Sequence, residues 1–171
     1  HDRPFPELIE PNVLGLYHVL DAARGHGIRS VTLASSIQVL GRRRSGGMAS
    51  VDDASPANHY ALTKLWAEQM GRMYAERFGL DVLAVRIAWM VRDQAEAEHL
   101  VELERPELFL SARDAGRFFR LAVERRVPGF EIVYAGSLGS EKIFDLEPAE
   151  RLLGYTPLDR WPEGLDFPYL V

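Results

Sequence analysis

Residues 28–35 read Ile-Arg-Ser-Val-Thr-Leu-Ala-Ser, a short apolar run that begins directly after Gly27. A run of this length after a glycine is typical of a strand buried on both faces of a parallel sheet. The segment before it, residues 7–25, carries apolar side chains at helical spacing and ends at Gly25 and Gly27. This part of the chain therefore predicts a helix followed by a buried strand.

The same alternation continues along the chain. Residues 57–78 are good helix formers that stop at Gly79, and residues 81–87 form a second apolar strand. The later predicted elements are a helical segment over 93–104, an extended piece at 109–110, a helix over 111–125, a strand over 130–134 and a helix over 147–153 closed by Gly154. Alternating helices and strands predict an α/β fold, a parallel sheet with helices on both faces.

The composition narrows the class of protein. The chain has 171 residues, 47% of them hydrophobic and 26% charged, with a formal net charge of −5. These values are typical of one globular domain, and the mild acidity argues against a nucleic-acid partner. No stretch approaches the ~20 apolar residues of a membrane span, so no membrane partner is expected. The absence of cysteine fits the reducing cytoplasm, which we take as the expected location.

Several kinds of catalytic site are missing from the sequence. The five histidines have no metal-ligand spacing, so we expect no metal. A Gly-x-Ser-x-Gly elbow and a phosphate-binding glycine loop are absent too. Serine-hydrolase and nucleoside-triphosphatase chemistry are therefore not indicated.

The candidate for chemistry is Tyr60-Ala61-Leu62-Thr63-Lys64, early in a predicted helix. At a spacing of four, Tyr60 and Lys64 share one helix face. A nearby ammonium lowers the pKa of a phenol, so the pair can exchange a proton with an alcohol. Ser35 and Ser36 end the preceding strand, where a hydroxyl is well placed to hold the substrate oxygen.

A structural interpretation stands beside the catalytic one. On most helices this pattern is a half-buried tyrosine beside a lysine whose aliphatic stem packs on the surface. Lys64, however, is one of only two lysines among the 20 basic residues, since all the others are arginines. The position of the pair, after a long loop and a strand ending in serines, favours catalysis.

The chain resembles the extended short-chain dehydrogenase/reductases, the NAD-dependent epimerase/dehydratase family. The matching segments are Asn12-Val13-Leu14-Gly15, Leu20-Asp21-Ala22-Ala23-Arg24, Val31-Thr32-Leu33-Ala34-Ser35-Ser36, Val39-Leu40-Gly41, Pro56, Tyr60-Ala61-Leu62-Thr63-Lys64, Glu68-Gln69, Ala84-Val85-Arg86-Ile87 and Leu152-Leu153-Gly154-Tyr155-Thr156-Pro157. Within the family the chain is most similar to the uronate dehydrogenases, through Arg3-Pro4-Phe5, Asn12-Val13-Leu14-Gly15-Leu16-Tyr17, Arg72-Met73-Tyr74 and Phe78-Gly79.

The resemblance implies roles for the proton-transfer residues. Tyr60 is expected to be the general base in alcohol oxidation and the acid in reduction. Lys64 is expected to lower the pKa of Tyr60 and to hold the nicotinamide ribose. Ser36 is expected to form a hydrogen bond with the reacting oxygen and so to bind the substrate.

The resemblance also implies binding residues. The cofactor-binding candidates are Asn12, Ser35, Tyr60 and Lys64. The substrate-binding candidates are Ser36, Gln38 and Arg92. Other interpretations stay open for two of them, because Asn12 fits a helix-capping amide and Ser35 fits a buried hydroxyl bonded to the backbone. The implied domain is a single α/β unit over 1–171, the C-terminal portion of an NAD(P)-binding Rossmann-fold domain. It has a catalytic core over 1–90 and a substrate-side region over 91–171.

The sequence departs from the family pattern in its cofactor site. The Gly-x-x-Gly-x-x-Gly turn of that site does not occur here, so the main half of the NAD or NADP site is expected upstream, in about 70–80 further residues. We expect the 171 residues alone to bind NAD poorly. Ile37 stands where uronate dehydrogenases place a polar residue. The run Arg42-Arg43-Arg44 fits either an anion contact or, by preference, a solvated loop tip.

Two functions follow. The first is an NAD(P)-dependent oxidoreductase or epimerase acting on a sugar, sugar acid or nucleotide sugar. The second is a non-catalytic fragment or interaction module that no longer binds NAD. In either case the resemblance implies a homodimer that pairs through the helices over 7–25 and 57–78.

Overall fold

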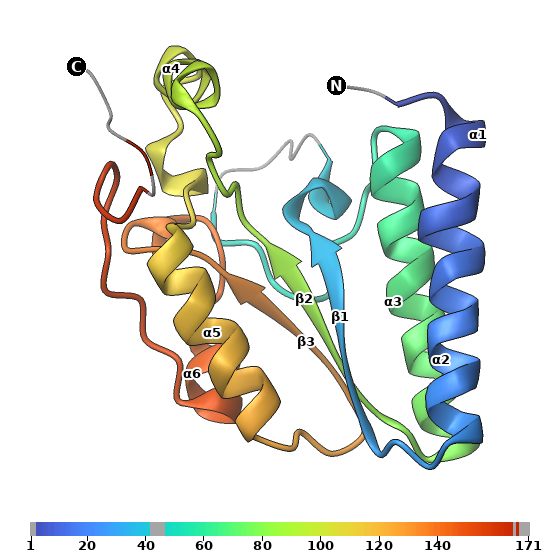
Figure 1. Ribbon diagram of the computed structural model, residues 1–171. Coiled ribbons are helices and arrows are strands. Elements are labelled where there is room, and N and C mark those ends of the chain that lie inside the picture. Colours follow the sequence, from blue (N-terminus) through green and yellow to red (C-terminus); the bar gives the residue numbers. More distant parts are fainter. Residues whose placement is uncertain (1–2, 42–46, 166, 168–171) are drawn as a thin grey trace.

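The structure, a computed structural model, describes residues 3–41, 47–165 and 167. At its centre lies a parallel sheet in the order β1-β2-β3 (Figure 1). β1 spans Ser30–Ser36, β2 spans Asp81–Ile87 and β3 spans Phe130–Ala135. Among the residues described, no strand pairs with the outer edge of β1.

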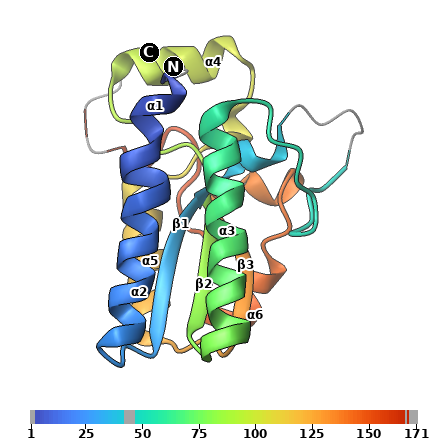
Figure 2. The ribbon, with the colours of Figure 1, turned by 90° about the vertical axis from the view of Figure 1, so that its right-hand side faces the viewer.

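Helices cover both faces of this sheet. α2 (Gly15–Gly25) and α3 (His59–Phe78) lie side by side on one face (Figure 2). α5 (Ala112–Glu124) and α6 (Glu147–Leu153) lie on the other, and α4 (Gln94–Glu102) lies beyond the C-terminal ends of the strands (Figure 1). The predicted α/β fold, a Rossmann-like parallel sheet between helices, is confirmed. The division of the chain at residue 90 stays a prediction.

Short 3-10 helices occur in the connections. They are η2 (Ile37–Leu40), η3 (Pro106–Leu108) and η4 (Ser140–Lys142). η2 follows β1 without a break, so the chain turns as soon as the strand ends.

The predicted helix over 7–25 is divided into three segments. α1 (Phe5–Leu8) leads into a π-helical segment, η1 (Ile9–Leu14), and α2 follows. Pro11 accounts for the interruption, because proline lacks an N–H and its ring clashes with the carbonyl four residues before it. The wider π turn accommodates this ring, and such turns are frequent at functional sites. Asn12 lies in this turn.

α3 is fixed at both of its ends. The Asn58 side chain caps its start by accepting a hydrogen bond of 2.8 Å from the Ala61 N–H. Gly79 ends it in the left-handed conformation, with a φ of 68°. Gly71 brings the helix close to the sheet, since an added Cβ would lie 2.8 Å from Leu33 and 2.9 Å from Val82. The first residues of α3 are thereby held near the end of β1.

Candidate active site

The candidate site lies where β1 ends and α3 begins, at the C-terminal edge of the sheet (Figure 1). This edge is where α/β sheets usually bind ligands. Ser35 and Ser36 are the last residues of β1, and Tyr60 is the second residue of α3. The main chain turns directly after Ser36, whose hydroxyl oxygen accepts a hydrogen bond of 3.2 Å from the Gln38 N–H. Residues 24 positions apart in the sequence therefore meet at one place.

Tyr60 and Ser36 lie close together where β1 ends and α3 begins, near enough for the Ser36 hydroxyl to act on the Tyr60 phenol. Burial raises the pKa of the Tyr60 phenol above its ordinary value, and the Ser36 hydroxyl acts in the opposite direction. The resemblance implied that Lys64 lowers this pKa, and that effect of Lys64 stays a prediction. Burial outweighs the other effects because an ionised phenol loses the stabilisation of water.

Lys64 lies next to Tyr60 on α3, as their spacing predicts. Its ammonium nitrogen is 5.5 Å from the centre of the Tyr60 ring and donates a hydrogen bond of 3.0 Å to the Ala34 carbonyl. Burial lowers the pKa of Lys64. An ammonium has three N–H donors, so donors remain for a bound ligand after the Ala34 contact.

Asn12 connects the π-helical segment to the first turn of α3. Its amide donates a hydrogen bond of 2.9 Å to the Thr63 hydroxyl, which in turn donates to the Tyr60 carbonyl at 2.7 Å. The Asn12 side chain thus bonds another helix instead of capping its own. Thr63 thus links Asn12 to the main chain of Tyr60. We did not predict this role, although Thr63 lies inside the Tyr60–Lys64 motif.

Ser35 points into the protein. It is buried, and its hydroxyl donates a hydrogen bond of 2.6 Å to a carboxylate oxygen of Glu68. That partner is a side chain, whereas the structural interpretation of Ser35 named the backbone. A part for Ser35 in binding the cofactor stays a prediction.

Glu68 and Arg86 form a buried ion pair beside the candidate site. Each side chain is 1% exposed, and the guanidinium contacts both carboxylate oxygens, at 2.9 Å and 3.0 Å. We did not predict this pair. Two signals were available: Glu68 lies four residues after Lys64, and Arg86 is a charge inside an apolar strand, which requires a partner.

The two substrate-binding candidates other than Ser36 form hydrogen bonds within the protein. The Gln38 side-chain oxygen accepts a hydrogen bond of 3.1 Å from the amide of Asn58, two residues before Tyr60 in the sequence. Arg92 lies in the segment after β2, largely exposed, with its guanidinium bound to Glu96. Substrate binding by either residue stays a prediction. The Arg42-Arg43-Arg44 run lies outside the described residues.

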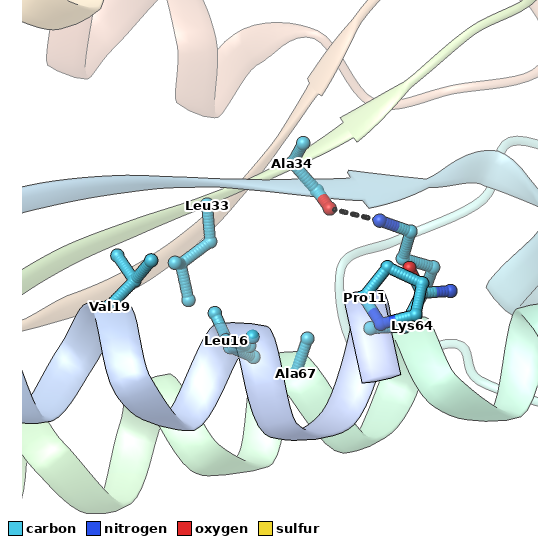
Figure 3. A pocket seen from close by; sticks show the side chains of 9 residues that line it. Pro11, Leu16, Val19, Leu33, Ala34, Lys64 and Ala67 are labelled. Atoms are coloured by element: carbon cyan, nitrogen blue, oxygen red, sulfur yellow. Dashed lines mark hydrogen bonds between the residues drawn. The ribbon is translucent and has the colours of Figure 1, made fainter. Parts of the chain in front are cut away.

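A cavity of about 340 Å³ lies beside the candidate site (Figure 3). It is lined by η1 and α2, by β1 and by α3, at Pro11, Asn12, Gly15, Leu16, Val19, Leu33, Ala34, Lys64 and Ala67. Leu16, Val19 and Leu33 point toward one another in the apolar part, while Lys64 reaches the Ala34 carbonyl (Figure 3). The cavity therefore joins an apolar space to the ammonium of Lys64.

These residues fit one end of a nicotinamide dinucleotide. The spare donors of Lys64 suit ribose hydroxyls, and Tyr60 and Ser36 suit the oxygen of an alcohol or carbonyl. Dinucleotide pyrophosphate is usually held by a glycine-rich turn, and the Gly-x-x-Gly-x-x-Gly form of that turn does not occur in this sequence. The described residues thus fit the reactive end of the cofactor.

Two other kinds of feature are absent from residues 3–41, 47–165 and 167. No group of three or more His, Asp or Glu side chains there is arranged to hold a metal ion. No helix of this part is long and apolar enough to cross a membrane.

Comparison with known proteins agrees with this geometry. The family model described as the NAD dependent epimerase/dehydratase family matches residues 6–100, more than half of the chain. The chain belongs to this family. The matched region includes the whole candidate site, from Asn12 to Lys64 and on to the Glu68–Arg86 pair.

Among characterised relatives, the chain is similar to the uronate dehydrogenase of Pseudomonas syringae pv. tomato. The two are 29% identical over 161 residues, which cover 92% of this chain and 55% of that protein. The L-arabinose 1-dehydrogenase (NAD(P)(+)) of Haloferax volcanii is 28% identical, over 92% of this chain and 70% of its own length. The chain thus spans just over half the length of the uronate dehydrogenases it matches, 55% and 57% for the two from Pseudomonas.

Solved structures give the same result. A mutated uronate dehydrogenase superposes with a TM-score of 0.79 at 26% identity, over 94% of this chain and 56% of that one. A mutant of the Agrobacterium tumefaciens uronate dehydrogenase, complexed with NAD, superposes with a TM-score of 0.76 at 25% identity, over 92% and 57% of the two chains. The α/β arrangement of this chain is therefore that of a part of these enzymes.

Proposed function

We propose that this chain is the proton-transfer and substrate-side part of an NAD(P)-dependent oxidoreductase or epimerase acting on a sugar, sugar acid or nucleotide sugar. One observation carries the proposal: Ser36, Tyr60 and Lys64 lie together at the C-terminal edge of a parallel sheet. The uronate and L-arabinose dehydrogenases among its relatives make a sugar or sugar acid the first substrates to test.

Each residue of the site has one part in the reaction. Ser36 bonds the oxygen of the reacting alcohol and holds it near Tyr60. Tyr60 takes the hydroxyl proton while a carbon–oxygen double bond forms, and it returns a proton in the reverse reaction. The nicotinamide of a bound NAD(P) would supply the acceptor for the hydride of the same carbon. Lys64 binds the nicotinamide ribose and keeps a positive charge near the phenol.

The remaining candidates bind and orient. Asn12 holds the Thr63 hydroxyl and so supports the first turn of α3. Ser35 is proposed to contribute to cofactor binding by fixing the end of β1 beside the cofactor. Gln38 and Arg92 are proposed to contact the substrate, in which case a substrate carboxylate must displace Glu96 from Arg92. We place the protein in the cytoplasm, consistent with its lack of cysteine.

A second function, a non-catalytic interaction module, rests on a different observation. η1, α2 and α3 form a helical layer on one face of the sheet (Figure 2). This layer exposes large apolar side chains. They are Leu14, Tyr17, Val19, Leu62 and Met73. We propose that a second copy of the chain covers this surface, giving a homodimer, whether or not the chain is catalytic.

A turnover assay separates the two functions. The protein isolated from its own source is mixed with NAD⁺ or NADP⁺ and with a uronic acid or L-arabinose. The reduced nicotinamide is followed by its absorbance and the sugar product by chromatography. An oxidoreductase predicts reduced cofactor with at least one of these substrates, and an epimerase predicts an epimerised sugar without net cofactor reduction. A dimer in solution with no cofactor bound and no turnover would support the interaction module instead.

A further inference from the structure

The buried carboxylate of Glu68 connects three parts of the candidate site. In α3 it lies one turn after Lys64 and two turns after Tyr60. One of its oxygens accepts both the Ser35 hydroxyl, at 2.6 Å, and the Arg86 Nε, at 2.9 Å. The other accepts Arg86 Nη2 at 3.0 Å. A single anion thus joins the catalytic helix to the ends of β1 and β2.

The network follows one row of residues across the sheet. The strand register pairs Ser35 with Arg86, and Arg86 with Tyr134 of β3. Side chains in register on neighbouring strands lie on the same face, here the face that α3 covers. Arg86 Nη1 donates to the Tyr134 hydroxyl at 2.9 Å, so the row is continuous from β1 to β3.

The same network holds the loop that leads into α3. Arg86 Nη1 also donates to the Asp53 carbonyl at 2.8 Å, and the Tyr134 hydroxyl donates to the Ser50 carbonyl at 2.7 Å. Both carbonyls lie in the connection between β1 and α3. The Glu68–Arg86 pair therefore holds together the strand that ends in Ser36, the helix that carries Tyr60 and the loop between them.

A buried ion pair of this kind is seldom retained for stability alone. Apolar side chains of the same volume often stabilise a fold as well or better, because removing two charges from water is costly. What the pair does provide is direction, since both carboxylate oxygens and most of the guanidinium donors have fixed partners. The position of Ser35 is thereby defined, and with it the position of its neighbour Ser36.

We propose that Glu68 is a positioning residue that acts through Ser35 and Arg86 to hold Ser36 beside Tyr60. The placement of Ser36 beside Tyr60 is the feature that depends on it. Its consequence for turnover rests on the proposed function, whereas its consequence for Tyr60 itself does not.

The test measures the state of the Tyr60 ring directly. The protein is labelled with ¹³C at the hydroxyl-bearing carbon of tyrosine, and the Tyr60 signal is assigned by its loss in Tyr60→Phe. Ser36 and Lys64 are the polar groups that face this ring in the structure. Ser35→Ala removes the hydrogen bond between β1 and Glu68 and leaves the Glu68–Arg86 ion pair in place. We expect the Tyr60 signal to shift and its pKa to rise further, because the Ser36 hydroxyl that lowers it is held less closely.

Ser137→Ala is the matched control. Ser137 is buried after β3, near the start of α5, and its hydroxyl donates to a buried carboxylate, that of Asp114, at 2.7 Å. The change removes the same atoms from the same kind of contact but touches neither β1 nor α3. The proposal predicts no change at Tyr60 in this variant. An unchanged Tyr60 titration in Ser35→Ala, or an equal change in both variants, would overturn it.

Glu68→Gln tests the Glu68 carboxylate itself. The amide keeps one oxygen acceptor and loses the charge, so Ser35 and Arg86 must compete for it. We expect the Tyr60 signal to shift as in Ser35→Ala. In the active holoenzyme both variants should lower kcat on the order of tenfold or more, with KM little changed. If the NMR effect is present without any turnover, the proposed function fails and the positioning role of Glu68 stands.

Discussion

The ammonium nitrogen of Lys64 lies 5.5 Å from the centre of the Tyr60 ring, one turn further along α3. Burial acts on both members of the pair, raising the pKa of Tyr60 and lowering that of Lys64. Both shifts favour the uncharged forms, because each charge loses contact with water. Tyr60 is therefore held as the neutral phenol at neutral pH.

This protonation state sets the pH dependence of the proposed reaction. Oxidation needs the phenolate of Tyr60, so its rate should rise as the pH rises toward the elevated pKa of the phenol, about tenfold per unit below that pKa. Reduction needs the phenol and should fall only above that pKa. Initial rates in both directions from pH 6 to about 10 test this, the reference value for tyrosine being near 10. An oxidation rate independent of pH over that range would be inconsistent with Tyr60 as the base.

The buried Glu68–Arg86 pair predicts how the unfolding free energy changes when one or both partners are replaced. Arg86→Met leaves the Glu68 carboxylate buried without its partner and should cost about 3–5 kcal/mol of unfolding free energy. Adding Glu68→Leu removes the unpaired charge and should recover much of that loss. Urea unfolding of the single and double variants measures both quantities.

An exposed ion pair supplies the control for these variants. Arg92 and Glu96 form a pair in which the arginine side chain is 76% exposed. Arg92→Met should leave the unfolding free energy nearly unchanged, because an exposed ion pair is screened by water. Equal losses for the buried and exposed pairs would contradict the structural account of the network.

The close approach of α3 to the sheet predicts the effect of a single added carbon. A Cβ at Gly71 would lie 2.8 Å from Leu33 and 2.9 Å from Val82, so Gly71→Ala should cost about 1–3 kcal/mol. Gly116 lies within α5 with open space around it, and Gly116→Ala should stabilise the fold by up to about 1 kcal/mol. Thermal unfolding of the two variants should give melting temperatures that move in opposite directions.

Much of the fold could be predicted because local signals determine it. The strand at 81–87 has its predicted bounds, and Gly79 and Gly154 end their helices in the left-handed conformation as expected. The helix over 7–25 is the exception, since the effect of Pro11 on it was not anticipated. Its π-helical turn resolves a clash between the proline ring and the main chain, which helical periodicity alone does not reveal.

The candidate site was predictable only in part. The Tyr60–Lys64 motif and the serines at the end of β1 could be found by spacing, and the structure brings Ser36 and Tyr60 close together. The partner of Arg86 could not be found this way, because Glu68 lies on a helix and reaches it only through the packing of α3 on the sheet. The direction of the Tyr60 pKa shift likewise depends on burial, which a motif does not specify.

The most direct test of the account is the production of reduced nicotinamide by the protein isolated from its own source, compared with the Tyr60→Phe variant. The wild-type protein should reduce NAD⁺ or NADP⁺ with a sugar or sugar acid. Tyr60→Phe should lose about 10²-fold or more of this rate while binding the cofactor as before, because only the proton-transferring oxygen is removed. Tyr17→Phe, at an exposed tyrosine of α2, should leave the rate unchanged. Full activity in Tyr60→Phe would contradict the proposed function, and so would a wild-type protein that neither reduces the cofactor nor epimerises any of these substrates.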